Sequence, residues 1–209
     1  MTTQKGMFIS LEGSEGVGKS TSLNYIKQYI ESLGHRVVVT REPGGTPLAE
    51  EIRELLLSKR DESVEINTEL LLMFAARCQH LEQVIKPALN KGHWVICDRF
   101  VDASYAYQGG GRGVSVEKIR ALDEWCLQGF SPDLTILLDM SVEQGLERTK
   151  LRGEADRFEI EKMTFFENIR KAYLDRAKNE PDRIAIVDAS PSIEKVQQDL
   201  KSLLSEKCG

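Results

Sequence analysis

The chain has 209 residues, a net charge of -5 and 41% hydrophobic residues, a balance that fits one ordinary globular domain. This composition excludes an intrinsically disordered chain, and no apolar run approaches the roughly 20 residues that span a bilayer. The acidic charge argues against a nucleic-acid-binding surface, and it leaves room for a local basic site that binds a small phosphate. The first residues show no signal-peptide pattern and the four cysteines have no CxxC spacing, so we expect a cytoplasmic protein with reduced thiols.

Short apolar runs alternate with longer helical patterns along the chain, which is typical of βαβ units and a parallel sheet. Apolar runs predict five strands covered on both faces, at residues 8–11, 36–40, 94–97, 134–138 and 184–187. After the first strand, apolar residues recur at helical spacing from Leu23 to Leu33, and Gly34 provides a stop. Further helices are expected at residues 48–57, 68–90, 116–127, 142–151, 162–178 and 193–204, with Ser190 and Pro191 starting the last one. The chain shows no repeat and no linker, so we predict one α/β domain over residues 1–209.

Directly after the first predicted strand, residues 13–20 match the phosphate-binding pattern G-x-x-x-x-G-K-[ST]. Glycines let successive backbone N–H groups turn toward phosphate oxygens, and the N-terminus of the following helix adds partial positive charge. Lys19 is then placed to reach the β- and γ-phosphates, and Ser20 to hold Mg²⁺ through its hydroxyl. An ordinary glycine-rich turn is the alternative. The residues expected to bind the nucleoside triphosphate are Gly13, Ser14, Glu15, Gly16, Val17, Gly18, Lys19, Ser20 and Thr21.

A nucleoside triphosphate site leaves several classes of protein open. GTPases need the guanine-reading pattern N-K-x-D, and the single Asn-Lys pair of the chain, Asn90-Lys91, continues with glycine and histidine. The chain is also too short for a large ATPase motor. The remaining classes are small-molecule kinases and nucleotide-dependent binding modules that use the loop as a switch.

Three further segments follow the second and third predicted strands, at the edge where ligands collect in open α/β sheets. They are residues 40–46 (TREPGGT), 98–100 (DRF) and 104–113 (SYAYQGGGRG). Together with the phosphate-binding loop they closely resemble the bacterial branch of the thymidylate kinases, over residues 7–204. The resemblance implies a three-layer P-loop NTPase fold with a five-stranded parallel sheet, ATP as donor, dTMP as acceptor, Mg²⁺ as cofactor and a homodimer. Another nucleoside or nucleoside monophosphate kinase remains the alternative within the class.

Two charged residues of the DRF segment are candidates for the reaction itself. Arg99 carries a planar guanidinium suited to hold the acceptor phosphate in line with the γ-phosphate of ATP. Asp98 ends the third strand, where a carboxylate can organise Mg²⁺, its water or Arg99. The alternatives are a structural pair between these two side chains and a capping role for Asp98.

The helix predicted over residues 68–90 carries Arg77 on an otherwise apolar face. Such an arginine needs a partner, which is either the thymine edge, as the resemblance implies, or a buried ion pair. The family's stacking phenylalanine usually lies four residues earlier, where this chain has Met73 followed by Phe74, and we expect these two residues to share the role.

The resemblance implies further substrate-binding residues: Glu42, Pro43, Arg53, Ser104, Tyr107 and Gln108. The ring of Tyr107 would exclude a ribose hydroxyl. Without the resemblance, Arg53 looks like a solvated helix charge and Tyr107 like a packing residue. The Glu42-Pro43 bond is a candidate cis peptide that aims the glutamate into the cleft, and the glycines of residues 109–113 predict a flexible turn.

Glu15 stands where some thymidylate kinases carry a basic residue, and it is expected near the acceptor's 3′-hydroxyl or a magnesium-bound water. The positive charge for the transferred phosphoryl group must then come from elsewhere, and residues 148–157 hold four basic groups around Gly153. We therefore predict a lid at about residues 148–158 that closes over ATP. Arg152 or Arg157 is expected to reach the γ-phosphate, and Arg148 to stack near the adenine. The alternative is an exposed, salt-bridged helix end.

Overall fold

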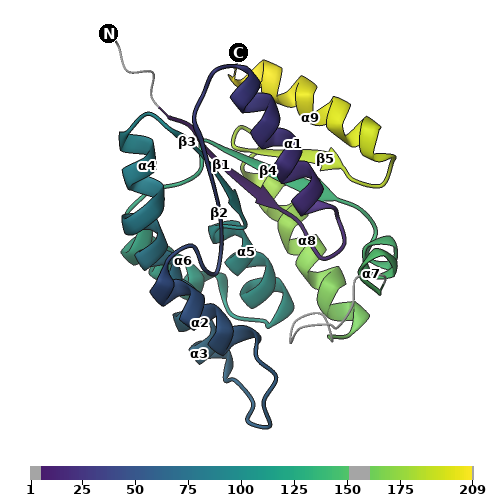
Figure 1. Cartoon of the computed structure of the whole chain (residues 1–209). Coiled ribbons are helices and arrows are strands. Elements are labelled where there is room, and N and C mark those ends of the chain that lie inside the picture. Colours follow the sequence, from purple (N-terminus) through teal and green to yellow (C-terminus); the bar gives the residue numbers. More distant parts are fainter. Residues whose placement is uncertain (1–5, 151–160, 209) are drawn as a thin grey trace.

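The centre of the fold is a five-stranded parallel sheet in the order β2-β3-β1-β4-β5 (Figure 1). The structure is a computed structural model that describes residues 6–150 and 161–208. Its strands are β1 (Phe8–Glu12), β2 (Val37–Arg41), β3 (Trp94–Asp98), β4 (Leu134–Asp139) and β5 (Ile184–Asp188). The predicted strands are confirmed to within one residue at each end, because apolar runs of this kind are covered on both faces of a parallel sheet.

Helices cover both faces of the sheet, which gives the three predicted layers (Figure 1). On one face, α1 (Lys19–Ser32) and α9 (Ile193–Cys208) share a hydrophobic cluster with residues of β1 and β4. The opposite face carries two further clusters, to which α3, α4, α6, α7 and α8 contribute. The bounds of these and the remaining helices are α2 (Pro47–Leu57), α3 (Ile66–His80), α4 (Lys86–Asn90), α5 (Val101–Ser104), α6 (Val116–Leu127), α7 (Val142–Lys150) and α8 (Met163–Asn179).

The side chains of β1 alternate between the two faces, as the pleat of a strand requires. Ile9 and Leu11 join the cluster under α1 and α9, while Phe8 joins the cluster on the opposite face. Ser10 is the polar exception on that second face, and its Oγ lies 2.7 Å from Thr135 Oγ1 of β4. The hydroxyl pair marks the start of a buried polar network behind the site.

The helix predicted over residues 68–90 is present, but its middle is wider than an α-helix. α3 continues into a π-helical segment at Leu81–Ile85 and then into α4. Pro87 has no N–H to donate to a carbonyl in the preceding turn, so the backbone adopts a wider turn before it.

The prediction of a flexible turn at residues 109–113 is wrong for its first three glycines. Tyr105–Gly111 form a second π-helical segment that continues α5. A Cβ atom at Gly110 would lie 2.7 Å from the carbonyl oxygen of Asn168, and one at Gly111 would lie 2.5 Å from the ring of Phe165. These glycines therefore let the segment approach α8 closely, and a glycine run does not distinguish close packing from a turn.

The start of α9 is as predicted, but its capping residue is not. The helix begins at Ile193, and its first turn is capped by Ser192, whose Oγ accepts a hydrogen bond from the Lys195 N–H at 3.4 Å. Ser190 instead donates its backbone N–H to Asp188 Oδ1 at 2.9 Å. The serine-proline pair lies in the turn before the helix, two residues earlier than the cap.

Within residues 6–150 and 161–208, no helix combines the length and the apolar character needed to cross a bilayer. Three cysteines in this part of the chain, Cys78, Cys97 and Cys126, are free thiols.

Candidate active site

A cavity of about 250 Å³ opens at the edge of the sheet where β1, β2 and β3 end. The three segments meet there because β1 lies beside β3, with Leu11 opposite Asp98, and β2 pairs with β3 on its other side. Most of the predicted site residues line this cavity, namely Glu15, Gly16, Val17, Gly18, Lys19, Ser20, Glu42, Pro43, Arg53, Met73, Arg77, Asp98, Arg99, Ser104, Tyr107 and Gln108.

The phosphate-binding loop wraps around the side chain of its own lysine. Lys19 Nζ donates hydrogen bonds to the carbonyl oxygens of Gly13 at 3.1 Å and Ser14 at 3.0 Å. Burial lowers the pKa of Lys19, and the nearby Arg99 charge lowers it further. Gly16 has a φ of +75°, and a Cβ there would lie 1.9 Å from the carbonyl oxygen of Gly145. The loop geometry thus requires glycine at that position.

Arg99 is bound to the phosphate-binding loop, and not to Asp98 as the structural alternative supposed. Its Nη2 donates to Glu15 Oε1 at 2.6 Å, and its Nη1 donates to the Tyr107 hydroxyl at 2.7 Å and to the Gly13 carbonyl at 3.2 Å. The Tyr107 hydroxyl donates in turn to Glu15 Oε1 at 2.7 Å. Burial opposes the ionisation of Glu15, but the charges of Arg99 and Lys19 outweigh it and lower the pKa of Glu15 to about 2. The guanidinium therefore has an anionic partner inside the cavity.

Asp98 and Ser20 are the two residues expected to hold a metal, and both line the cavity. Asp98 Oδ1 is buried and has no hydrogen-bond partner within the protein. Among residues 6–150 and 161–208, no group of three or more His, Cys, Asp or Glu side chains is arranged to hold a metal. These residues fit Mg²⁺, which keeps several waters and takes most other ligands from substrate phosphates.

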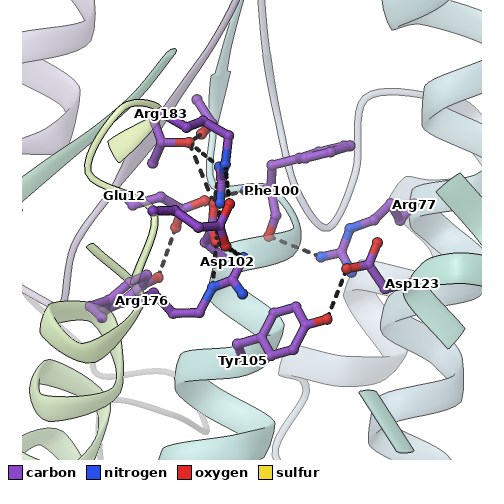
Figure 2. A network of polar contacts seen from close by, with 12 residues as sticks. Glu12, Arg77, Phe100, Asp102, Tyr105, Asp123, Arg176 and Arg183 are labelled. Atoms are coloured by element: carbon purple, nitrogen blue, oxygen red, sulfur yellow. Dashed lines mark hydrogen bonds and ion pairs between the residues drawn. The ribbon is translucent and has the colours of Figure 1, made fainter. Parts of the chain in front are cut away.

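Arg77 is buried and its three nitrogens are bonded to protein groups. Nε donates to Glu42 Oε2 at 2.7 Å and Nη1 to Ser104 Oγ at 2.9 Å. Nη2 donates to the Phe100 carbonyl at 3.1 Å, the contact drawn in Figure 2. Burial disfavours the charged guanidinium, but Glu42 outweighs this and raises the pKa of Arg77. The buried ion pair is therefore present, and Arg77 also lines the cavity.

Glu42 lies between two basic residues of α3. Its Oε1 is 3.0 Å from His80 Nδ1, and the other ring nitrogen of His80 is 2.6 Å from Thr40 Oγ1. The Glu42-Pro43 peptide bond is cis, as expected. The glutamate was predicted to point into the cleft. Glu42 lines the cavity, and its carboxylate oxygens are bonded to Arg77 and His80.

Met73 and Phe74 do not share one environment. Met73 lines the cavity, whereas Phe74 is buried in the core with the Arg77 guanidinium 4.7 Å from its ring centroid. Successive residues of a helix project about 100° apart, so the two side chains cannot face the same side. This corrects the expectation of a shared role, because of the two only Met73 reaches the cavity.

The other predicted polar residues also have protein partners. Gln108 Nε2 donates to Glu69 Oε1 at 2.9 Å. Arg53 Nη1 donates to the Pro43 carbonyl at 3.0 Å, so Arg53 is not a solvated helix charge.

Some predicted site residues do not line the cavity. Gly13 and Ser14 contribute only their carbonyls to the contacts of Lys19 and Arg99, and Thr21 lies on the exposed side of α1. Arg148 on α7 donates to the carbonyls of Ala189 and Ser190, at 3.1 and 3.3 Å. Arg152 and Arg157 lie outside the described residues, as does most of the predicted lid.

Three residues at the site were not predicted from the sequence. Arg41, Leu57 and Ala103 also line the cavity. Arg41 is the last residue of β2 and donates to Glu50 Oε2 at 2.9 Å. Its position at the end of a predicted strand was the feature of the sequence that could have identified it as a site residue.

A buried charge network behind the cavity was also missed (Figure 2). Asp102 accepts hydrogen bonds from Arg176 and Arg183, each with a contact of 2.7 Å. Glu12, at the end of β1, accepts from the Phe100 N–H at 2.7 Å and from the Tyr173 hydroxyl at 2.8 Å. Burial, reinforced by the negative charge of Asp102, raises the pKa of Glu12 to about 8. A charged residue that ends an apolar strand was the only local signal for this network.

The raised pKa of Glu12 predicts how stability depends on pH. Between about pH 5 and 8 the native protein holds a proton on Glu12 that the unfolded chain has released, so the contribution of this group to stability falls as pH rises. The Glu12→Gln variant should lose less stability over this range than the wild type. Urea unfolding of both proteins at several pH values measures the difference, and parallel curves would contradict the raised pKa.

The strand order and the loop that follows β1 place this chain among the P-loop NTPases. Comparison with known proteins narrows the class: the thymidylate kinase family model matches residues 11–200. Thymidylate kinases from Pseudomonas putida strain GB-1 and Hahella chejuensis are 56% and 52% identical to it, each over 97% or more of this chain and 98% of their own length. The crystal structure of thymidylate kinase from Ehrlichia chaffeensis superposes with a TM-score of 0.78 at 32% identity, covering 96% of this chain and 99% of that one. The chain belongs to the thymidylate kinase family.

Proposed function

We propose that this chain transfers the γ-phosphate of ATP to dTMP in the cavity at the end of β1, β2 and β3, giving ADP and dTDP. The observation that carries the proposal is the position of Arg99 in the same cavity as Lys19. Lys19 belongs to the loop that binds the donor phosphates, and Arg99 faces the part of the cavity in which an acceptor fits. The match to the thymidylate kinase family identifies the acceptor as dTMP.

The donor side uses the loop over residues 13–21. Its backbone N–H groups and the N-terminus of α1 bind the phosphates of ATP, and Lys19 exchanges the carbonyls of Gly13 and Ser14 for phosphate oxygens. Mg²⁺, held through Ser20 and Asp98, would neutralise charge on the β- and γ-phosphates. No residue needs to form a covalent intermediate, since positioning and charge suffice for phosphoryl transfer.

On the acceptor side, the phosphate of dTMP takes the place of Glu15 as the partner of Arg99. A bidentate guanidinium contact then holds the acceptor oxygen in line with the γ-phosphate. The released Glu15 lies near the acceptor's 3′-hydroxyl or a magnesium-bound water. Arg53, which already contacts the Pro43 carbonyl, supplies a second cation for the same phosphate.

The thymine and the deoxyribose occupy the part of the cavity lined by Met73, Arg77, Ser104, Tyr107 and Gln108. Arg77 reads the base edge while Glu42 holds its guanidinium in place. Met73 covers the ring, because its thioether is polarizable and the neighbouring phenylalanine faces the core. Arg152 or Arg157 approaches the γ-phosphate from the lid, and Arg148 lies near the adenine.

A coupled assay of ADP release, with and without dTMP, tests this function. ADP formation should require dTMP and should be much slower with dUMP, AMP, CMP or GMP. ADP release that does not respond to dTMP would favour a nucleotide-dependent switch. A preference for another monophosphate in the same panel would favour a different nucleoside monophosphate kinase.

Tyr107 provides a prediction about the sugar. Tyr107→Phe should keep the preference for dTMP over the ribonucleotide, because the volume of the ring near C2′ excludes the hydroxyl. Tyr107→Ala should relax that preference. The ratio of kcat/KM for the two nucleotides measures this preference. If Tyr107→Ala discriminates as well as the wild type, another residue excludes the ribose hydroxyl.

We also propose that two copies of this chain form a homodimer that packs through α3 and α6. The protein is proposed to act in the cytoplasm, without binding nucleic acid or a membrane. Leu71 on α3 and Trp125 on α6 are 55% and 74% exposed, although large apolar side chains are usually covered. Trp125→Glu should shift the protein to a smaller species in analytical ultracentrifugation. Ile193→Glu on α9, at the opposite face of the sheet, is the matched control and should leave the mass unchanged. If the wild type, Trp125→Glu and Ile193→Glu all have the same mass in solution, this interface is excluded.

A further inference from the structure

Arg99 presents its guanidinium from a backbone conformation that residues with a side chain rarely adopt. Its φ is +70°, in the left-handed region, and Gln128 is the only other non-glycine residue with positive φ in residues 6–150 and 161–208. A conformation of this kind persists only where the surrounding structure fixes it. Arg99, which the proposed mechanism requires, is thus also a residue whose backbone conformation needs support from its surroundings.

Both peptide groups beside the Cα of Arg99 are fixed by hydrogen bonds. On the N-terminal side, the Arg99 N–H donates to the Leu11 carbonyl at 3.0 Å. On the C-terminal side, the Arg99 carbonyl accepts from Cys97 Sγ at 2.9 Å, and the Phe100 N–H donates to Glu12 Oε1 at 2.7 Å. Since φ and ψ describe the rotation of these two peptide planes about one Cα, fixing both planes fixes the conformation of Arg99.

Two of these three contacts come from side chains, and neither side chain lines the cavity. Glu12 and Cys97 are both fully buried. Glu12 is itself oriented by the Tyr173 hydroxyl, 2.8 Å from its second oxygen. Glu12 and Cys97 are therefore outside the cavity, and their direct hydrogen bonds to the site are those to the two peptide groups beside Arg99.

We propose that Glu12 and Cys97 are positioning residues that lock Arg99 in the left-handed conformation and so aim its guanidinium at the acceptor phosphate before dTMP binds. Without the lock, the backbone relaxes to negative φ and the side chain leaves the direction of Glu15 and the phosphate-binding loop. The inference rests on the proposed role of Arg99 in holding the acceptor phosphate.

The test compares paired variants at the two positions. Glu12→Gln keeps an oxygen that accepts from the Phe100 N–H, whereas Glu12→Met removes it at similar volume. Cys97→Ser keeps a donor for the Arg99 carbonyl, whereas Cys97→Ala removes it. We expect kcat/KM for dTMP to fall about 10- to 100-fold in Glu12→Met and about 3- to 10-fold in Cys97→Ala, with the KM for ATP nearly unchanged. The conservative variants should stay within about threefold of wild type. Tyr173→Phe removes the hydroxyl that orients Glu12 and should cause a smaller loss than Glu12→Met. Tyr29→Phe, whose hydroxyl lies 2.7 Å from Ser205 Oγ at the surface, is the control.

Each of the two disruptive changes is also made in an Arg99→Ala background. If Glu12 and Cys97 act through Arg99, they cause no further loss of kcat/KM there, whereas a general structural role predicts losses that multiply. Multiplying losses, or wild-type kinetics in both disruptive variants, would overturn the proposal. If Glu12→Met does not fold, the comparison of Cys97→Ala with Cys97→Ser tests the proposal, because Cys97→Ala removes only a single sulfur atom and should still fold.

A crystal structure of Cys97→Ala separates this inference from the proposed function. Relaxation of Arg99 to negative φ supports the lock even if the wild type proves inactive on dTMP, an outcome that would refute only the function. If Arg99 keeps a positive φ in Cys97→Ala and the kinetics are unchanged, the proposed positioning role is refuted.

Discussion

Lys19→Ala is expected to lower kcat by about 10³-fold while the affinity for dTMP changes little. Lys19 lies inside the phosphate-binding loop, bonded to the carbonyls of Gly13 and Ser14, and we place it on the donor phosphates and the transferred group. Its charge therefore matters most in the transition state, when negative charge on the moving phosphoryl group is greatest. Steady-state kinetics measure turnover, and calorimetry measures dTMP binding.

The matched control for this experiment is Lys27→Ala. Lys27 also lies on α1, but its side chain is 42% exposed and its carboxylate partner Glu31 is 3.8 Å away. This variant should behave like the wild type in both assays. A Lys19→Ala variant that loses dTMP affinity as severely as turnover would contradict the assignment of separate donor and acceptor sites.

Arg77→Ala is expected to reduce both stability and the use of dTMP. It leaves the Glu42 carboxylate buried without the guanidinium that lies 2.7 Å from it, and breaking a buried pair in this way costs on the order of 3–5 kcal/mol. Loss of a charged hydrogen bond to the base should also lower kcat/KM for dTMP by roughly 30- to 150-fold. Urea unfolding and kinetics on folded protein measure the two effects separately.

The double variant Arg77→Ala/Glu42→Gln distinguishes a structural role for Arg77 from base recognition. Neutralising Glu42 removes the uncompensated charge, so much of the lost stability should return. The use of dTMP should not return, because the group that reads the base is still absent. Recovery of both properties in the double variant would show that Arg77 serves only as a buried ion pair.

Local features of the sequence were sufficient for the strands and for the long helices, whereas α5 and the π-helical segment after it were not predicted. The strands were predicted to within one residue because each is an apolar run covered on both faces of a parallel sheet. The start of α1 at Lys19 follows from the glycines before it, and its end follows from Gly34, with a φ of +89°. Similarly, residues 13–20 identify a nucleotide site because the spacing of their glycines and lysine is itself the binding geometry.

What the sequence could not determine was the partner of each charged side chain. Arg99 pairs with Glu15, 84 residues away, and Glu42 with Arg77, 35 residues away, because the parallel sheet brings the ends of separate strands together. Local patterns carry no information about such contacts, so Glu12 and its bond to the Phe100 N–H were missed.

The same limit explains the two local errors at the site. A run of glycines is compatible with a turn and with close packing, and only the position of α8 against Gly110 and Gly111 decides between them. Met73 and Phe74 are both apolar, and only the orientation of α3 relative to the cavity determines which one reaches it. The sequence alone determined the fold class, the nucleotide loop and the family resemblance, because each is encoded in contiguous residues. The tertiary structure decided which side chains meet, because burial and charge pairing depend on segments that are distant along the chain.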